Sequence, residues 1–145
     1  MNLDKLAKWA PIFLSILRIV VALLFIEHGT QKFFDFPASG RPGPGGPMSA
    51  EFMLAGAIEI VGGLLVLFGL FTRYAAFIMA GEMAVAYWTM HVPMGGFFPL
   101  VNFGESAVLF CFVFLYIFFA GPGPLSLDGM LAKRQGWGRQ EMATN

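Results

Sequence analysis

Four long runs of apolar residues alternate with polar or broken segments along the chain. They cover about residues 11–34, 50–71, 73–91 and 102–120, which gives each about 19 to 24 residues. A helix rises about 1.5 Å per residue, so each run can cross a hydrocarbon core about 30 Å thick. The pattern predicts an all-α integral membrane protein, with residues 1–145 forming a single domain built as a four-helix transmembrane bundle.

The segments between these runs contain residues that interrupt helices. Residues 35–50, DFPASGRPGPGGPMSA, are rich in glycine and proline, which predicts an irregular loop at the membrane surface. Residues 92–101, VPMGGFFPLV, hold two prolines and two glycines, so we expect a non-helical segment that is re-entrant or lies at the interface. A polar, basic tail is expected over residues 126–145.

The distribution of lysine and arginine predicts the orientation, because cytoplasmic loops of membrane proteins carry an excess of both. Arg41 is the loop cation on the outer side of the four-helix arrangement, which places the loop 35–50 outside and both termini in the cytoplasm. No small-residue cleavage site follows the first run, so we expect it to be retained. Arg18 lies in its inner half and is expected to snorkel inward. The cytoplasmic side collects Lys5, Lys8, Arg73, Lys133, Arg134 and Arg139.

Composition supports a membrane location and narrows the possible functions. The chain is 57% hydrophobic and 12% charged, whereas soluble domains carry about 25% charged residues. The lipid bilayer is therefore an expected partner, and the net charge of zero gives no support for nucleic-acid binding. Cys111 is the single cysteine, so no internal disulfide or C-x-x-C pair can form. Any redox role needs a cofactor or a partner protein.

Polar residues interrupt the apolar runs at matched depths. Ionisable residues inside a membrane are costly and usually face the bundle interior or a water-filled cavity. Each run carries one acid, and the acids of the second and third runs, Glu59 and Glu82, are expected at similar depth. The sequence thus predicts a polar pocket in the outer half of the bundle, narrowing toward these two acids. Its candidate residues are Glu59, Glu105 and His28 for proton handling and Lys32, Asn102, His91, Gln31 and Glu82 for ligand binding, with Glu27 beside His28.

Several interpretations of these residues stay open. Adjacent carboxylates in a low dielectric cannot both ionise easily and would share a proton, which suits proton transfer. Each residue alone can also serve as interhelical glue through hydrogen bonds or ion pairs. Lys32 is expected to form an ion pair with Glu105 or to act as a base. No metal site is expected, because neither candidate acid shows the Glu-x-x-His spacing of di-iron bundles.

Several motifs in a fixed order resemble the DoxX family over about residues 15–130. The first run, LRIVVALLFIEHGTQKFF, is followed by the Glu-x-x-Gly-Gly of the second, a Leu-Phe-Thr-Arg turn and Asn-x-Gly-Glu at the start of the fourth. The chain then ends its fourth run with Gly-Pro-Gly-Pro-x-Ser-Leu-Asp. Glu27 departs from the apolar or small residue usual before the histidine, and Asn102-Phe103-Gly104 departs from Asn-Gly-Gly. The family's polar signature falls on His28, Lys32, Glu59, Arg73, His91, Asn102 and Glu105.

The resemblance implies a small, four-helix, multi-pass protein of a bacterial-type inner membrane, linked to redox and oxidative-stress functions. The family name comes from similarity to a subunit of an archaeal thiosulfate:quinone oxidoreductase. We therefore expect a subunit or accessory of a quinone-linked redox system, with a quinone as ligand, no covalently bound cofactor, and a soluble or membrane redox partner. The absence of a cofactor motif argues against an independent enzyme. The alternatives are a small-molecule or lipid transporter working as a homo-oligomer, and a non-catalytic membrane scaffold for a soluble redox partner.

Overall fold

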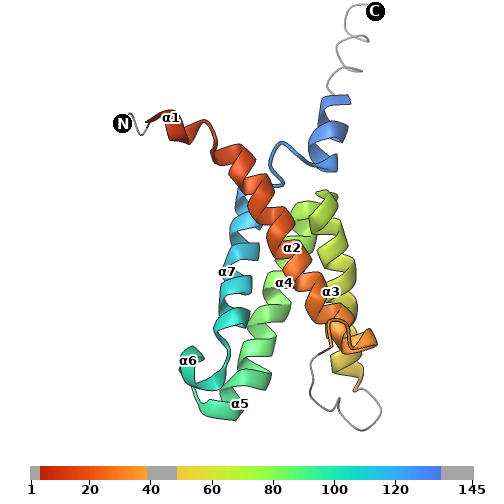
Figure 1. The fold of residues 1–145 in the computed structure, drawn as a ribbon, viewed down its shortest axis with the longest axis vertical. Helices are drawn as coiled ribbons and strands as arrows, with labels where there is room; N and C mark the ends of the chain where they lie inside the picture. Colours follow the sequence, from red (N-terminus) through yellow and green to blue (C-terminus); the bar gives the residue numbers. More distant parts are fainter. Residues whose placement is uncertain (1–3, 39–48, 135–145) are drawn as a thin grey trace, which may run out of the picture.

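The regular elements of the described residues, 4–38 and 49–134, are all helical in the computed structural model (Figure 1). Parts of the predicted loop (35–50) and tail (126–145) therefore lie outside the described residues. Arg41 and Arg139 also lie outside them. A final helical stretch covers residues 127–134. The elements are α1 (Asp4–Ala7), α2 (Ala10–Phe34), α3 (Ala50–Phe68), α4 (Thr72–Ala86), the π-helix η1 (Tyr87–His91), α5 (Val92–Gly95), α6 (Pro99–Asn102) and α7 (Glu105–Ala120).

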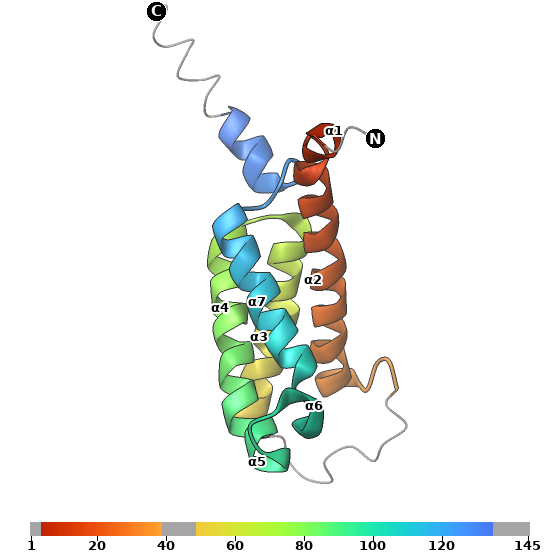
Figure 2. The ribbon, with the colours of Figure 1, turned by 90° about the vertical axis from the view of Figure 1, so that its left-hand side faces the viewer.

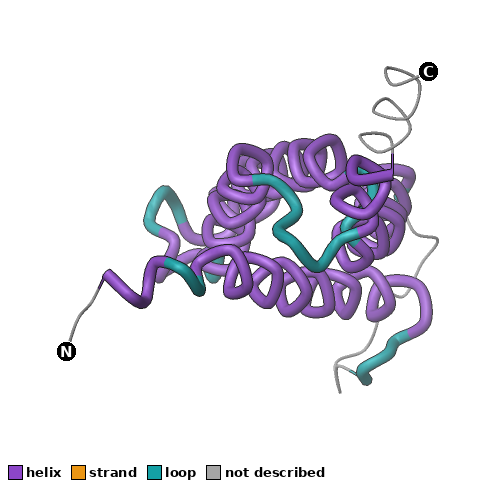
Figure 3. Tube along the Cα trace, turned by 90° about the horizontal axis from the view of Figure 1, so that it is seen from above, coloured by secondary structure: helices purple, strands orange, loops and turns teal. Residues whose placement is uncertain are grey.

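Four long helices, α2, α3, α4 and α7, lie side by side (Figures 2 and 3). The helix α3 packs against both α2 and α4, and α7 packs mainly against α4. The turn between α3 and α4, α1 and residues 127–134 share one end of the molecule, which we call the termini end (Figure 1). The short helices α5 and α6 lie at the opposite end, the loop end, where α2 finishes and α3 begins.

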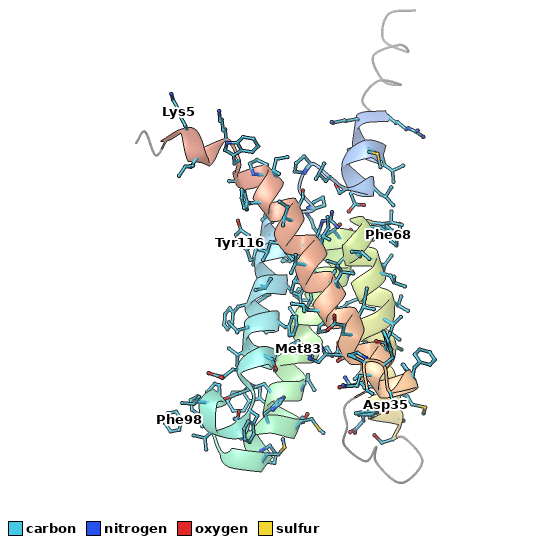
Figure 4. All side chains as sticks on the ribbon, in the orientation of Figure 1. Lys5, Asp35, Phe68, Met83, Phe98 and Tyr116 are labelled. Carbon is cyan, nitrogen blue, oxygen red and sulfur yellow. The ribbon has the colours of Figure 1, made fainter. Side chains whose placement is uncertain are left out.

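The outside of these helices is apolar. The helices α2 and α3 are long and apolar enough, by length and composition, to cross a membrane, and α7 is a shorter apolar helix. Large hydrophobic side chains are exposed on all four helices, among them Leu23, Val61, Phe77 and Phe112. In Figure 4, Phe68 and Tyr116 project from the outer surface of the helices. Apolar surface of this extent suits contact with lipid better than contact with water.

Three helix boundaries differ by three or more residues from those that the apolar pattern predicts. The helix predicted over residues 50–71, α3, ends at Phe68, three residues before the predicted end. It ends there because Gly69 adopts a left-handed conformation with φ 69° and its N–H bonds the carbonyls of Leu65 and Val66. The expectation of a non-helical segment over residues 92–101 is wrong in part. The third helix continues through η1 into α5, and α6 forms a second short helix before α7 starts at Glu105.

Arg18 is completely buried at the termini end, so its expected snorkelling to the surface does not occur. Its Nε donates to the carbonyl of Pro122 at 2.8 Å, and Nη2 donates to Leu125 in the segment after α7. Its Nη1 donates to the carbonyls of Val66 and Leu67, the last turn of α3. The last carbonyls of a helix lack partners from its regular hydrogen bonding, and of these two the Val66 carbonyl also accepts from the N–H of Gly69 at 3.1 Å. Arg18 thus joins three segments of the chain.

Asp128, close to Arg18, bonds the turn between α3 and α4. Its carboxylate accepts hydrogen bonds from the backbone N–H groups of Phe71 and Thr72, both at 2.9 Å, at the start of α4. Its own N–H donates to the carbonyl of Gly69 at 2.8 Å, and its charge acts on Arg18. A carboxylate at a helix N-terminus satisfies free N–H groups and interacts favourably with the helix dipole.

Glycines let α2 and α3 approach closely near the loop end. A Cβ added at Gly29 of α2 would lie 3.0 Å from both the Cβ of Glu59 and the carbonyl oxygen of Gly56 on α3. A Cβ at Gly63 of α3 would lie 2.5 Å from Cγ1 of Ile26 on α2. Small residues at helix interfaces are typical of membrane proteins. The glycines near Glu59 therefore set the distance between α2 and α3.

Gly29→Ala is expected to push α2 and α3 apart and to lower stability by about 1 to 3 kcal/mol, the usual cost of overpacking. Gly81→Ala is the matched control, because Gly81 lies inside a helix and a Cβ there would meet nothing within 4 Å. We expect the control to be neutral or slightly stabilising. Thermal unfolding in detergent measures both variants, and equal midpoints for the two would contradict the close packing at Gly29.

Candidate functional site

A buried ion pair joins α2 to α3 near the loop end. Lys32 lies in the last turn of α2, and its Nζ donates to Oε1 of Glu59. The Glu59 side chain is 1% exposed, whereas that of Lys32 is 21% exposed and lies 5.5 Å from the centre of the Phe52 ring. The pair therefore reaches from the interior toward the surface. The second carboxylate oxygen of Glu59, Oε2, is buried and has no hydrogen-bond partner among the described residues.

Glu82 of α4 lies on the side of Glu59 that is opposite to Lys32, because α3 packs between α2 and α4. Gly62 of α3 packs on Met79 of α4, since a Cβ at Gly62 would lie 2.9 Å from the Met79 sulfur. The two helices run in opposite directions, so one turn back from Gly62 and one turn forward from Met79 lead to Glu59 and Glu82 at the same level. The charges of Glu59 and Lys32 act on Glu82. We call Lys32, Glu59 and Glu82 the polar triad.

Both carboxylate oxygens of Glu82 are buried, and neither accepts a hydrogen bond within the described part of the chain. Buried polar groups almost always have partners, because losing hydration without compensation is costly. Together with Oε2 of Glu59, the polar triad presents three such oxygens. These oxygens can bind a proton or a hydrogen-bond donor.

His28 lies at the edge of the triad and is exposed. Its Nδ1 bonds the carbonyl of Leu24 at 2.8 Å, one turn back on α2. The ring packs edge-on against Phe110 of α7, with 5.4 Å between ring centres, and lies 6.5 Å from the ring of Phe25. The ring is near enough to Glu59 for an electrostatic interaction between the two groups. His28 therefore occupies the junction between α2 and α7, close to the triad and accessible from outside.

A second polar cluster at the loop end is formed by Asn102, His91 and Tyr87. Asn102 is completely buried, and its Nδ2 donates to the carbonyl of Gly96 at 2.7 Å and to the Tyr87 hydroxyl at 3.4 Å. Its Oδ1 accepts from the N–H of Gly104 at 2.8 Å. The ring of His91 lies within hydrogen-bond distance of the Asn102 carbonyl, at 3.2 Å. The Asn102 amide thus holds the segment between α5 and α7, and its role in ligand binding stays a prediction.

Tyr87 is a member of this cluster that the sequence interpretation did not include. Its hydroxyl donates to the carbonyl of Phe97. It precedes His91 by four residues, one helical turn, and that spacing was the available signal. The π-helix η1 begins at Tyr87 and ends at His91, and π-helices occur often at functional sites.

Two predicted site residues lie away from the triad. Gln31 is exposed and its Nε2 donates to the carbonyl of Pro37 at 3.1 Å. Glu105 is exposed in the first turn of α7. The expected ion pair between Lys32 and Glu105 is wrong, because Lys32 pairs with Glu59. The packing of α2 on α3, which brings Lys32 to Glu59, has no local signal in the sequence.

The structure also contains an apolar cavity of about 200 Å³ on the outer side of α3. It lies toward the termini end, is open to the outside and is separate from the triad. Its lining residues are Val61, Leu64, Leu65, Phe68, Leu70 and Leu127.

The fold and the site together define an all-helical membrane protein with an apolar exterior and with buried charges near both ends, Arg18 at the termini end and Glu59 near the loop end. Comparison with protein families shows to which family the chain belongs. The DoxX family model matches residues 13–92, more than half of the chain. The chain belongs to the DoxX family, and the resemblance seen in the sequence motifs is confirmed.

Three relatives extend this assignment. An uncharacterized protein of Haemophilus influenzae is 48% identical over 134 residues, covering 91% of this chain and 100% of that protein. The inner membrane protein YqjF of Escherichia coli is 30% identical, covering 88% and 98% of the two chains. CatD of Bacillus subtilis, named as a proposed oxidoreductase, is 28% identical, covering 81% and 86%. No solved structure matches the chain.

Proposed function

We propose that this protein is a subunit or accessory of a quinone-linked redox system in the inner membrane, and that it binds a quinone head group at the polar triad. The observation that carries the proposal is the buried Lys32–Glu59 pair with an unpartnered Glu59 oxygen, in a membrane protein of this family. A quinone carbonyl accepts hydrogen bonds, and its reduction to a quinol takes up two protons and two electrons. The name of the Bacillus subtilis relative is consistent with redox chemistry.

The residues near the triad suit this ligand. Lys32 is the cation that can donate to a quinone oxygen, and its partial exposure leaves it accessible. Glu59 and His28 can exchange protons with that oxygen, and the exposed ring of His28 lies where α2 meets α7. The electrons would come from a reduced redox partner protein. We assign Glu105 no direct contact with the head group, since it is exposed at the start of α7.

The proposal includes a four-helix transmembrane bundle with both termini in the cytoplasm. The described cations support this orientation, because most of them lie at the termini end and cytoplasmic flanks are rich in lysine and arginine. The polar triad would then open toward the outer half of the membrane. The supporting residues are Lys5, Lys8, Arg73, Lys133 and Arg134.

Quinone binding to the purified, detergent-solubilised protein tests the proposal. We expect saturable binding by the wild type and at least about tenfold weaker binding, about 1.4 kcal/mol, for Lys32→Ala and Glu59→Gln. The matched controls are Lys8→Ala and Glu51→Gln, which remove one exposed cation and one exposed acid away from the triad. Absence of binding by folded wild-type protein would rule out a direct quinone site.

A scaffold for a soluble redox partner is the second candidate function. The last helical stretch, residues 127–134, ends in the exposed residues Lys133 and Arg134 at the termini end. Exposed basic residues on the proposed cytoplasmic side suit an acidic partner surface. This function would be favoured if Lys133→Glu with Arg134→Glu abolished redox activity in membranes while Glu59→Gln and His28→Ala left it intact.

A further inference from the structure

Glu82 is the member of the polar triad to which the proposed function gives no role, and both of its carboxylate oxygens are buried. It lies within α4, one turn from the contact between Met79 and Gly62. It is therefore at the same level along the helices as Glu59 on α3. Both of its carboxylate oxygens are buried without a hydrogen-bond partner among the described residues, although Lys32 acts on it electrostatically. The ammonium of Lys32 is already bonded to Glu59. Glu82 therefore has no direct counter-ion in this part of the structure.

We propose that Glu82 is a proton-binding residue, and that its neutral carboxyl group donates a hydrogen bond to Oε2 of Glu59. The proposal rests on two independent observations. The first is the opposed placement of the two acids across α3 and α4. The second is Oε2 of Glu59, which has no hydrogen-bond partner among the described residues and belongs to a side chain that is only 1% exposed. A proton between the two carboxyl groups gives a partner to oxygens on both of them.

The charges of the triad support one proton at this position. Lys32 carries one positive charge, and Glu59 and Glu82 would carry two negative charges if both were ionised. With one proton on Glu82, the triad is neutral, which is the favourable condition in a medium of low dielectric. The charges that act on Glu82 are those of Glu59 and Lys32, and His28 acts on Glu59. On α7, which also packs against α4, Glu105 is exposed and Cys111 is partly buried.

In this arrangement the polar triad holds one exchangeable proton between α2, α3 and α4, and we call it a proton store. The proton on Glu82 can pass to Oε2 of Glu59, and from Glu59 toward a ligand that bonds Lys32. Each transfer breaks one O–H bond and forms another, and the chain then regains its proton from water through the partly exposed end of the triad. The store does not require a quinone, because it depends on the three side chains alone. Its test is therefore separate from the test of quinone binding.

Infrared spectroscopy of the purified protein near neutral pH tests the proposal. The C=O stretch of a protonated carboxyl group is distinct from the bands of a carboxylate, and it shifts when the proton is exchanged for deuterium. We expect one such band in the wild type, its loss in Glu82→Gln, and its retention in the control Glu51→Gln, which alters an exposed acid at the start of α3. In Glu59→Gln the band is expected to shift, because the acceptor of its hydrogen bond changes.

Glu82→Gln should fold as well as the wild type, because glutamine keeps the donor and the neutral charge that the proposal assigns to Glu82. If this variant does not fold, Glu82→Asp provides the same test, and its carboxyl band is expected at a different position. Absence of a protonated carboxyl band in the wild type would overturn the proposal. So would stabilisation of the wild type by sodium ions that is lost in Glu82→Gln, because both acids would then be ionised around a cation.

Discussion

Arg18→Ala is expected to lower the free energy of unfolding by about 3 to 5 kcal/mol. The substitution removes donors from carbonyl groups in the last turn of α3 and in the segment after α7. It also leaves Asp128 without the buried cation on which it acts. An unsatisfied buried carbonyl costs about 1 to 3 kcal/mol, and Arg18 bonds four carbonyls, one of them in a fully buried contact. Unfolding in detergent, followed by circular dichroism, measures the loss.

Arg73→Ala is the matched control for Arg18. Its guanidinium also donates to the carbonyls of a helix end, those of Phe118 and Phe119 on α7, but Arg73 is exposed. Water can replace these bonds, so we expect a loss of about 1 kcal/mol or less. Arg18→Lys should fall between the two variants, because an ammonium group cannot reproduce the planar set of donors. Equal losses for Arg18→Ala and Arg73→Ala would contradict the role assigned to burial.

Lys32→Ala is expected to destabilise the protein by about 3 to 5 kcal/mol, because it leaves Glu59 buried without its cation. The loss should shrink as the pH falls, since a protonated Glu59 has no charge to bury. Glu59→Gln is expected to cost only about 1 kcal/mol, because Lys32 is partly exposed and its flexible side chain can reach water. Denaturation curves at two pH values measure both effects. A larger loss for Glu59→Gln than for Lys32→Ala would contradict this interpretation.

The helices and two of the four acids placed within the runs, Glu59 and Glu82, could be predicted from the sequence, because apolar run length and intramembrane charge are local signals. The other two, Glu27 and Glu105, are exposed in the structure. The first helix, predicted from residue 11 to 34, is observed as Ala10–Phe34. The matched levels of Glu59 and Glu82 also followed from counting residues along each run. The end of α3 at Phe68 depended on Gly69 and could have been predicted from that glycine.

Features that depend on which helices touch could not be predicted in this way. Lys32 bonds Glu59 because glycines bring α2 close to α3, and nothing local in the sequence excludes Glu105 as the partner. Arg18 bonds carbonyl groups about 50 and more than 100 residues away, so its burial depends on the folded chain. The π-helix at Tyr87–His91 directs His91 toward Asn102, whereas counting at 100° per residue describes only a regular α-helix.

The distinction between interhelical glue and a ligand site is the central question for the polar triad. Both interpretations predict that removing one charge is harmful. They differ for the double substitution Lys32→Met with Glu59→Leu, which replaces both charges by apolar side chains of similar size. Such replacements of buried ion pairs are often neutral or stabilising. The double variant is therefore expected to fold, with a loss of about 1 to 3 kcal/mol at most, because Glu59→Leu removes the acceptor of the Glu82 carboxyl group.

Quinone binding by this folded double variant is the most direct measurement. The account predicts that the variant stays folded but shows no saturable binding, because the donor and the acid that hold the head group are gone. Binding as tight as that of the wild type would contradict it and would show that Lys32 and Glu59 only join α2 to α3.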